Sequence, residues 1–174
     1  GDVETSAGAL QVRASSSHAT LIPAGGLVLG GAEDARTLTI TPVDDAIGTT
    51  KITVTVTDAN GGESSSEFDL TVTEVNDLPV LGALANRSTD EDTPLTIAFT
   101  VADVETSDAD LQVSVASGND SLVSATALEL GGSGANRSLT ITPLPHATGI
   151  SPITVTLTDA NGDRVSETFV VTVK

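Results

Sequence analysis

The chain has 174 residues, among which 24 Asp and Glu outnumber seven Lys and Arg, so its formal net charge is −17. This charge repels nucleic acid phosphates and anionic membrane surfaces, and cations are therefore the expected partners. The sequence has no cysteine, which excludes disulfides and thiolate metal sites, and no apolar run approaches the roughly 18 residues of a membrane-spanning helix.

The sequence repeats itself once, at an offset of 101 residues (position 103 less position 2) and without a gap. About half of the paired positions are identical, which indicates two tandem modules. Three motifs mark the repeat: DVETS at Asp2 and Asp103, LTITP at Leu38 and Leu139, and TDANG at Thr57 and Thr158.

The first copy, residues 1–75, is expected to be incomplete. Gly1 aligns with Ala102, so residues 79–101, which should form the first two strands of a module, have no counterpart in it. A β-sandwich that lacks two strands exposes its core and its strand edges. Three explanations are open: the sequence is a window cut from a longer array, the missing strands come from a neighbouring molecule by β-augmentation, or the copy is partly disordered.

Residues 76–79 are predicted to be a linker, and residues 80–174 a complete second module. Alternating apolar residues predict its strands, as in the run from Leu95 to Val101. In chain order these strands are 95–101, 111–116, 125–130, 138–142, 153–158 and 167–173, with 79–84 as an opening edge strand. Thr fills the outward positions of ITVTLT, and Asn-Gly in DANGD predicts a hairpin turn after Asp159.

Seven short strands in about a hundred residues, with no convincing helical periodicity, predict an all-β fold. The expected architecture is a pair of tandem, immunoglobulin-like, antiparallel Greek-key β-sandwiches. The aromatic residues Phe68 and Phe169 both occupy strand positions where burial in the core is expected.

The stretch ITVTVTDANGGESSSEFDLTVTEVNDLPV resembles the end of a cadherin repeat, and is still more similar to the cadherin-like tandem modules of large bacterial surface and secreted proteins, including adhesins. This resemblance implies an extracellular spacer repeat that contacts neighbouring repeats of the same array. It also implies calcium between the modules. The implied calcium ligands are Asp44, Asp45, Glu74, Asn76, Asp77, Asp103, Glu105 and Asp159.

The chemistry of these residues fits calcium independently, because Ca²⁺ takes six to eight oxygen ligands and clustered carboxylates repel one another until a cation arrives. We expect one or two ions, which would convert a hinge into a strut. In the second copy Pro145 and His146 replace Asp44 and Asp45, so the next junction is expected to bind calcium poorly or not at all. Without metal, Asp159 would simply cap a turn.

Other functions find less support in the sequence. His18 and His146 occupy unrelated places in the repeat, no GxSxG motif is present, and we expect no enzyme activity. A carbohydrate-binding β-sandwich is an alternative, although the chain has no Trp or Tyr to stack on sugars. A second alternative is a self-assembling fibre whose subunits exchange β-strands.

Overall fold

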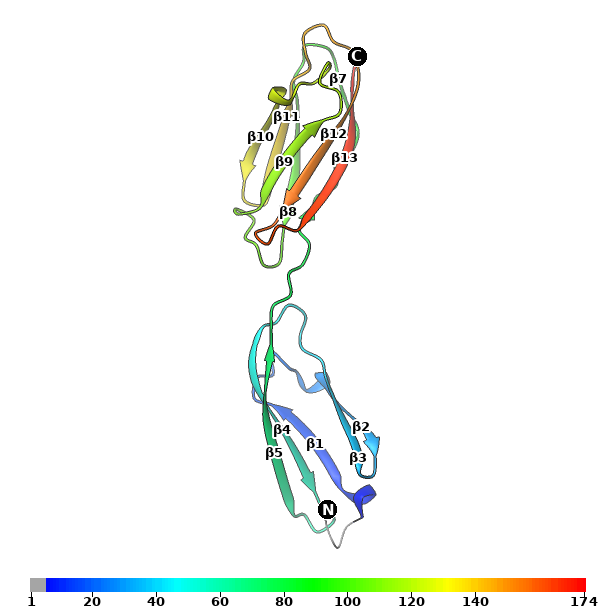
Figure 1. The fold of residues 1–174 in the computed structure, drawn as a ribbon, viewed down its shortest axis with the longest axis vertical. Coiled ribbons are helices and arrows are strands. Elements are labelled where there is room, and N and C mark those ends of the chain that lie inside the picture. Colours follow the sequence, from blue (N-terminus) through cyan, green and yellow to red (C-terminus); the bar gives the residue numbers. More distant parts are fainter. Residues whose placement is uncertain (1–5) are drawn as a thin grey trace. The chain divides into compact units, whose positions relative to one another are not determined.

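The structure, a computed structural model, describes residues 6–174, so the first DVETS motif lies outside the described residues apart from Ser6. The chain divides into two compact units, Gly1–Val75 (unit 1) and Asn76–Lys174 (unit 2) (Figure 1). Residues 76–79, the predicted linker, fall within unit 2. Within the described part of the chain, no helix is long and apolar enough to cross a membrane.

Unit 2 is a β-sandwich, as predicted, and it consists of two four-stranded sheets. One sheet has the strand order β10-β11-β8-β6, and the other has the order β7-β13-β12-β9. The strands are β6 (Val80–Leu81), β7 (Arg87–Thr89), β8 (Leu95–Ala102), β9 (Gln112–Ser117), β10 (Leu128–Ser133), β11 (Asn136–Ile141), β12 (Gly149–Thr158) and β13 (Arg164–Val173). Neighbouring strands are antiparallel except β7 and β13, which run parallel.

The core of unit 2 lies between these sheets and follows the period of two in the sequence. On β12 the side chains of Ile153, Val155 and Leu157 are fully buried, while the threonines between them point outward. Outward hydroxyls pair across strands, as Thr154 and Thr168 do at 2.9 Å. Apolar burial of this kind contributes about 1.5–3 kcal/mol for each large side chain, so it stabilises unit 2 strongly.

Several predicted strand boundaries in unit 2 are wrong. Strand β12 begins at Gly149, four residues before the predicted start. Pro152, which has no N–H to donate, is tolerated in this strand because the pairing with β9 ends at Ile153. The Pro152 carbonyl oxygen accepts a hydrogen bond from Gly118 N–H. Residues 125–127 form a 3₁₀ turn (η3, Ala125–Ala127) before β10. The opening strand, predicted over 79–84, is only β6, and the later strand β7 was not predicted because three residues are too few to show periodicity.

Unit 1 contains a smaller set of strands. A three-stranded sheet is formed by β1 (Gln11–Ser16), β4 (Gly48–Thr57) and β5 (Glu63–Val72), beside a hairpin of β2 (Leu27–Ala32) and β3 (Ala35–Ile40). Short 3₁₀ turns at Ala7–Ala9 (η1) and Ala24–Gly26 (η2) precede β1 and β2. Its buried apolar residues are Leu21, Ile22 and Ile52.

The two units differ most at their equivalent phenylalanines. Phe169 is 1% exposed in unit 2, whereas Phe68 is 44% exposed in unit 1, so the predicted burial of Phe68 is wrong. In unit 2 the strands β6, β7 and β8 complete the two sheets, and the described part of unit 1 has no counterpart of them. The β3 edge that would pair with a β8-like strand is therefore open.

Candidate metal centre

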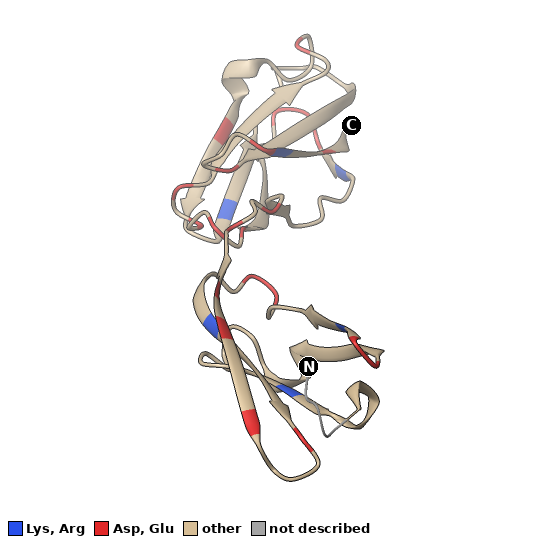
Figure 2. Cartoon of the chain, turned by 60° about the horizontal axis from the view of Figure 1, so that its bottom comes forward, with Lys and Arg blue, Asp and Glu red and all other residues tan. Residues whose placement is uncertain are grey.

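The acidic residues that the sequence predicts within unit 2 gather at one end of its sandwich. Strand β8 ends just before Asp103 and strand β12 ends just before Asp159, and these two neighbouring loops meet the first residues of the unit, Asn76 and Asp77. Figure 2 shows acidic residues in the loops at this end. We call the set Asn76, Asp77, Asp103, Glu105, Asp159 and Asp163 the candidate metal centre.

Asp159 is fixed by the hairpin turn that joins β12 to β13. Its Oδ1 accepts the backbone N–H groups of Asn161, Gly162 and Asp163 at 2.9, 2.7 and 2.8 Å, and only 4% of the residue is exposed. Gly162 adopts a φ of 96°, which favours glycine. Thus the TDANG motif forms the predicted hairpin, and Asp159 does cap the turn with one oxygen, leaving Oδ2 for another partner.

The side chain of Asn76 lies between two carboxylates. Its Nδ2 is 2.9 Å from Asp159 Oδ2, 2.9 Å from Asp163 Oδ2 and 3.0 Å from the Asp77 carbonyl oxygen. An amide nitrogen carries two protons, so it cannot donate a full hydrogen bond to all three oxygens. The hydrogen bond from Asn76 is the main cause that lowers the pKa of Asp159, backbone N–H groups add to it, and burial opposes it. Asp159 is therefore ionised at neutral pH.

Asp103 has one satisfied and one unsatisfied oxygen. Its Oδ1 accepts the N–H groups of Glu105 and Thr106 at 3.1 and 2.6 Å. Among the residues that the structure describes, Asp103 Oδ2 is the one buried side-chain oxygen or nitrogen without a hydrogen-bond partner. A buried polar atom without a partner destabilises a fold by about 1–3 kcal/mol, and more when it is charged. A carboxylate oxygen in this position can accept a cation as a partner.

The centre carries five carboxylates and no basic partner. Asp77 N–H donates to Glu105 Oε2 at 3.1 Å, which ties the entering chain to the loop after β8. Within residues 6–174, no Lys or Arg forms an ion pair with any of the five acids. Solvent or a bound cation must therefore offset the mutual repulsion of the carboxylates.

Sequence reasoning missed two members of this neighbourhood. Asp163 and Asn161 lie in the β12–β13 turn, where Asp163 replaces Gly62 of the first copy, and a hairpin turn brings its two ends together. That substitution beside the TDANG motif was the available signal. The remaining predicted ligands, Asp44, Asp45 and Glu74, are exposed residues of unit 1, and their part in calcium binding stays a prediction.

Comparison with known families identifies the chain. Residues 76–172, more than half of the sequence, match the family model described as bacterial Ig domain. The chain belongs to the bacterial Ig domain family. The matched residues begin at Asn76, the first residue of the candidate metal centre, and include all of the sandwich of unit 2 except the last residue of β13.

Solved structures share the fold of this bacterial Ig domain protein at low identity. Human CDH23 EC21-23 matches with a TM-score of 0.55 and 13% identity over 96% of this chain, which spans 59% of that chain. Protocadherin gammaB7 EC3-6 matches with a TM-score of 0.52 and 18% identity over 94% of this chain and 40% of that chain. No curated protein matches the chain in sequence. The predicted cadherin-like fold is therefore confirmed.

Proposed function

We propose that this chain is a spacer repeat of a large extracellular or cell-surface protein, and that unit 2 binds calcium at the candidate metal centre. The bacterial Ig fold supports a structural role, because a sandwich with its own core and chain ends at opposite poles can be joined in series. The negative charge of the chain suits an aqueous, cation-rich environment.

The unpaired Asp103 Oδ2 is the observation that carries calcium binding. Hydrogen bonds link Asp103 through Glu105 and Asp77 to Asn76. The Asn76 amide nitrogen in turn faces Asp159 Oδ2 and a second carboxylate, that of Asp163. These are hard oxygen donors, the ligands that Ca²⁺ prefers, and no nitrogen or sulfur ligand lies among them. A divalent cation would give Asp103 its missing partner and offset the repulsion of five acids.

The consequence for the array is mechanical. Asn76 and Asp77 are the first residues of unit 2, so a cation held by them together with Asp103 and Asp159 would fasten the entering chain to the sandwich. We propose that Glu74, Asp44 and Asp45 supply further oxygens from the preceding module, and that one or two ions bind. Calcium would then stiffen successive repeats into a rod for adhesion or a surface filament.

A calorimetric titration of the chain with calcium, after treatment with chelator, tests this proposal. We expect saturable binding that Asp163→Asn weakens by at least about tenfold, because even outer-shell partners of a metal typically contribute 10–100-fold in affinity. Asp163 is exposed, so the variant should fold normally. Asp120→Asn removes the same charge at another exposed position of unit 2 and should bind like the wild type. Absence of heat, or equal affinity in both variants, contradicts the proposal.

A second candidate function, strand acceptance, is favoured by the open side of unit 1. Among the described strands, β3 has no partner on the edge where the equivalent strand β11 pairs with β8, and Phe68 is 44% exposed. Donation of β8 by a second copy would expose the buried Ile97 and Phe99 of the donor, so we propose that a free segment with the pattern of β8, from another module, fills this place.

A labelled peptide with the sequence of residues 84–102 tests strand acceptance. We expect the intact chain to bind it in a saturable way and the amide signals of residues 35–40 to shift in NMR spectra, because the peptide completes the β3 edge. A scrambled peptide of the same composition should not bind. If neither peptide binds and the chain stays monomeric at every concentration, strand acceptance is excluded.

A further inference from the structure

A second cluster of metal-ligating side chains lies at the other end of unit 2, far from the candidate metal centre. Strand β12 begins three residues after His146 and ends one residue before Asp159, and its ten residues span about 33 Å. We call the set Glu91, Asp92 and His146 the histidine cluster. In contrast to the oxygen-rich centre near Asn76, this cluster contains an imidazole.

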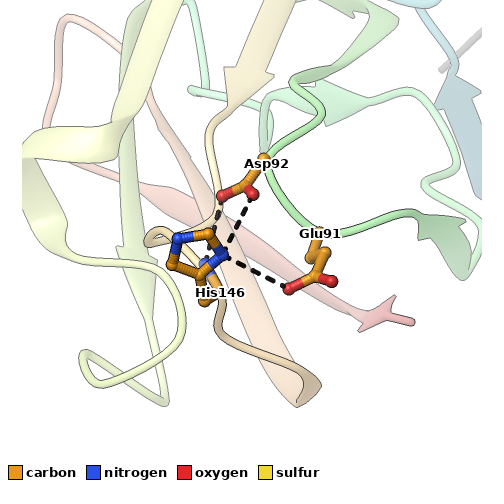
Figure 3. Close-up of side chains that lie close together, drawn as sticks. All are labelled: Glu91, Asp92 and His146. Atoms are coloured by element: carbon orange, nitrogen blue, oxygen red, sulfur yellow. Dashed lines mark hydrogen bonds and ion pairs between the residues drawn. The ribbon is translucent and has the colours of Figure 1, made fainter.

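The three side chains converge from two loops (Figure 3). His146 Nδ1 lies 3.4 Å from Asp92 Oδ2 and 4.0 Å from Glu91 Oε2, and one ligand atom from each residue lies within 4.8 Å of the others. The backbone N–H of His146 donates to Asp92 Oδ1 at 3.1 Å, and this hydrogen bond joins the loop before β12 to the loop before β8.

Each loop is held by the sandwich. Glu91 N–H donates to the Lys174 carbonyl oxygen at 2.9 Å, just beyond the end of β13. In the other loop, Leu144 N–H donates to the Leu122 carbonyl oxygen at 2.8 Å, two residues before His146. The two loops that carry the histidine cluster are therefore held by the sandwich, although the three side chains themselves are exposed.

We infer that the histidine cluster binds a divalent transition-metal cation, with zinc as the best fit. Zinc takes imidazole nitrogen and carboxylate oxygen at about 2.0–2.2 Å, and two such ligands on a tetrahedron lie about 3.3–3.5 Å apart. The distance of 3.4 Å from His146 to Asp92 agrees with this value, and Glu91 needs only a small side-chain movement. Water would complete the coordination.

The two copies of the repeat differ in ligand chemistry at this position. His146 occupies the position of Asp45 in the first copy, and both residues have a φ of 58°. At this equivalent backbone position, the first copy thus presents a carboxylate oxygen and the second an imidazole nitrogen. Ca²⁺ uses oxygen ligands almost exclusively, whereas imidazole suits zinc, copper, iron and nickel. The two ends of unit 2 are therefore chemically different, and they select different metals.

A zinc titration of the intact chain tests this inference, with calcium in excess so that oxygen-only sites are filled. We expect one zinc ion to bind with a shift of the His146 ring nitrogens in NMR spectra. Both His146→Asn and Asp92→Asn should weaken binding by at least about tenfold. His18 is the only other histidine in the chain, so His18→Asn is the matched control and should bind zinc like the wild type.

His146→Asp gives a sharper test, because it restores the residue that the first copy carries. We expect this variant to lose its preference for zinc over calcium while it unfolds at the same temperature as the wild type, since the side chain is 86% exposed. Zinc binding that is unchanged in the His146 variants, or no zinc binding by the wild type, overturns the inference. Neither result bears on calcium binding near Asn76, which is titrated separately.

Discussion

Replacing Phe169 by alanine should destabilise unit 2 by about 3–5 kcal/mol, whereas Phe68→Ala at the equivalent position of unit 1 should cost about 1 kcal/mol or less. The Phe169 ring is 1% exposed and sits among the apolar residues of both sheets. Its removal loses the transfer free energy of the ring and leaves a cavity. Phe68 is already 44% exposed, so replacing it loses less transfer free energy and leaves no closed cavity.

Chemical denaturation with amide NMR signals as the probe measures this difference, because separate signals report on each unit. The two variants form a matched pair: the same side chain is removed from the same position of the repeat. Similar losses in the two units would show that Phe68 is covered in solution, and would contradict the open side of unit 1.

Asp103→Asn should change the stability of unit 2 in opposite directions with and without calcium. In chelator we expect the variant to be more stable by about 1–3 kcal/mol, because it removes a partly buried charge whose Oδ2 has no partner. The asparagine oxygen can still accept the N–H groups of Glu105 and Thr106. In calcium at a thousand times its dissociation constant, the wild type alone gains about 4.1 kcal/mol, which exceeds this difference.

Thermal unfolding of both proteins in chelator, in calcium and in magnesium gives the comparison. The ranking of the two melting temperatures should reverse between chelator and calcium. The same ranking in every buffer would show that Asp103 is a structural residue whose buried oxygen finds water, and would remove it from the calcium site.

Much of unit 2 is predictable because its periodicity is regular. Residues 95–101 and 153–158 alternate strictly, and one face of each strand is buried as expected. The pattern fails where distant segments decide burial. Phe68 has the sequence context of a core residue, but residues 6–75 form no strands that would cover it. Periodicity also says nothing about three-residue elements such as β7.

The candidate site was predictable in its location more than in its membership. Asp103 and Asp159 follow the ends of strands, and the sandwich brings those ends together. The geometry of a single hairpin turn decides that Asn76 lies between two carboxylates and that one of them belongs to Asp163. His146 was not predicted as a metal ligand, and its acidic neighbours Glu91 and Asp92 lie more than fifty positions earlier in the chain.

The parallel pairing of β7 with β13 determines how unit 2 responds to a pulling force. Chain enters the unit near Asp159 and leaves it near Glu91, at opposite ends of β13. Tension on the two chain ends therefore pulls β7 and β13 in opposite directions along their length, so the hydrogen-bond ladder from Arg87 to Thr89 is loaded in shear. In shear the hydrogen bonds must break together, whereas a peeled hairpin loses them one at a time. A sandwich with this strand pairing is suited to resist tension along its length.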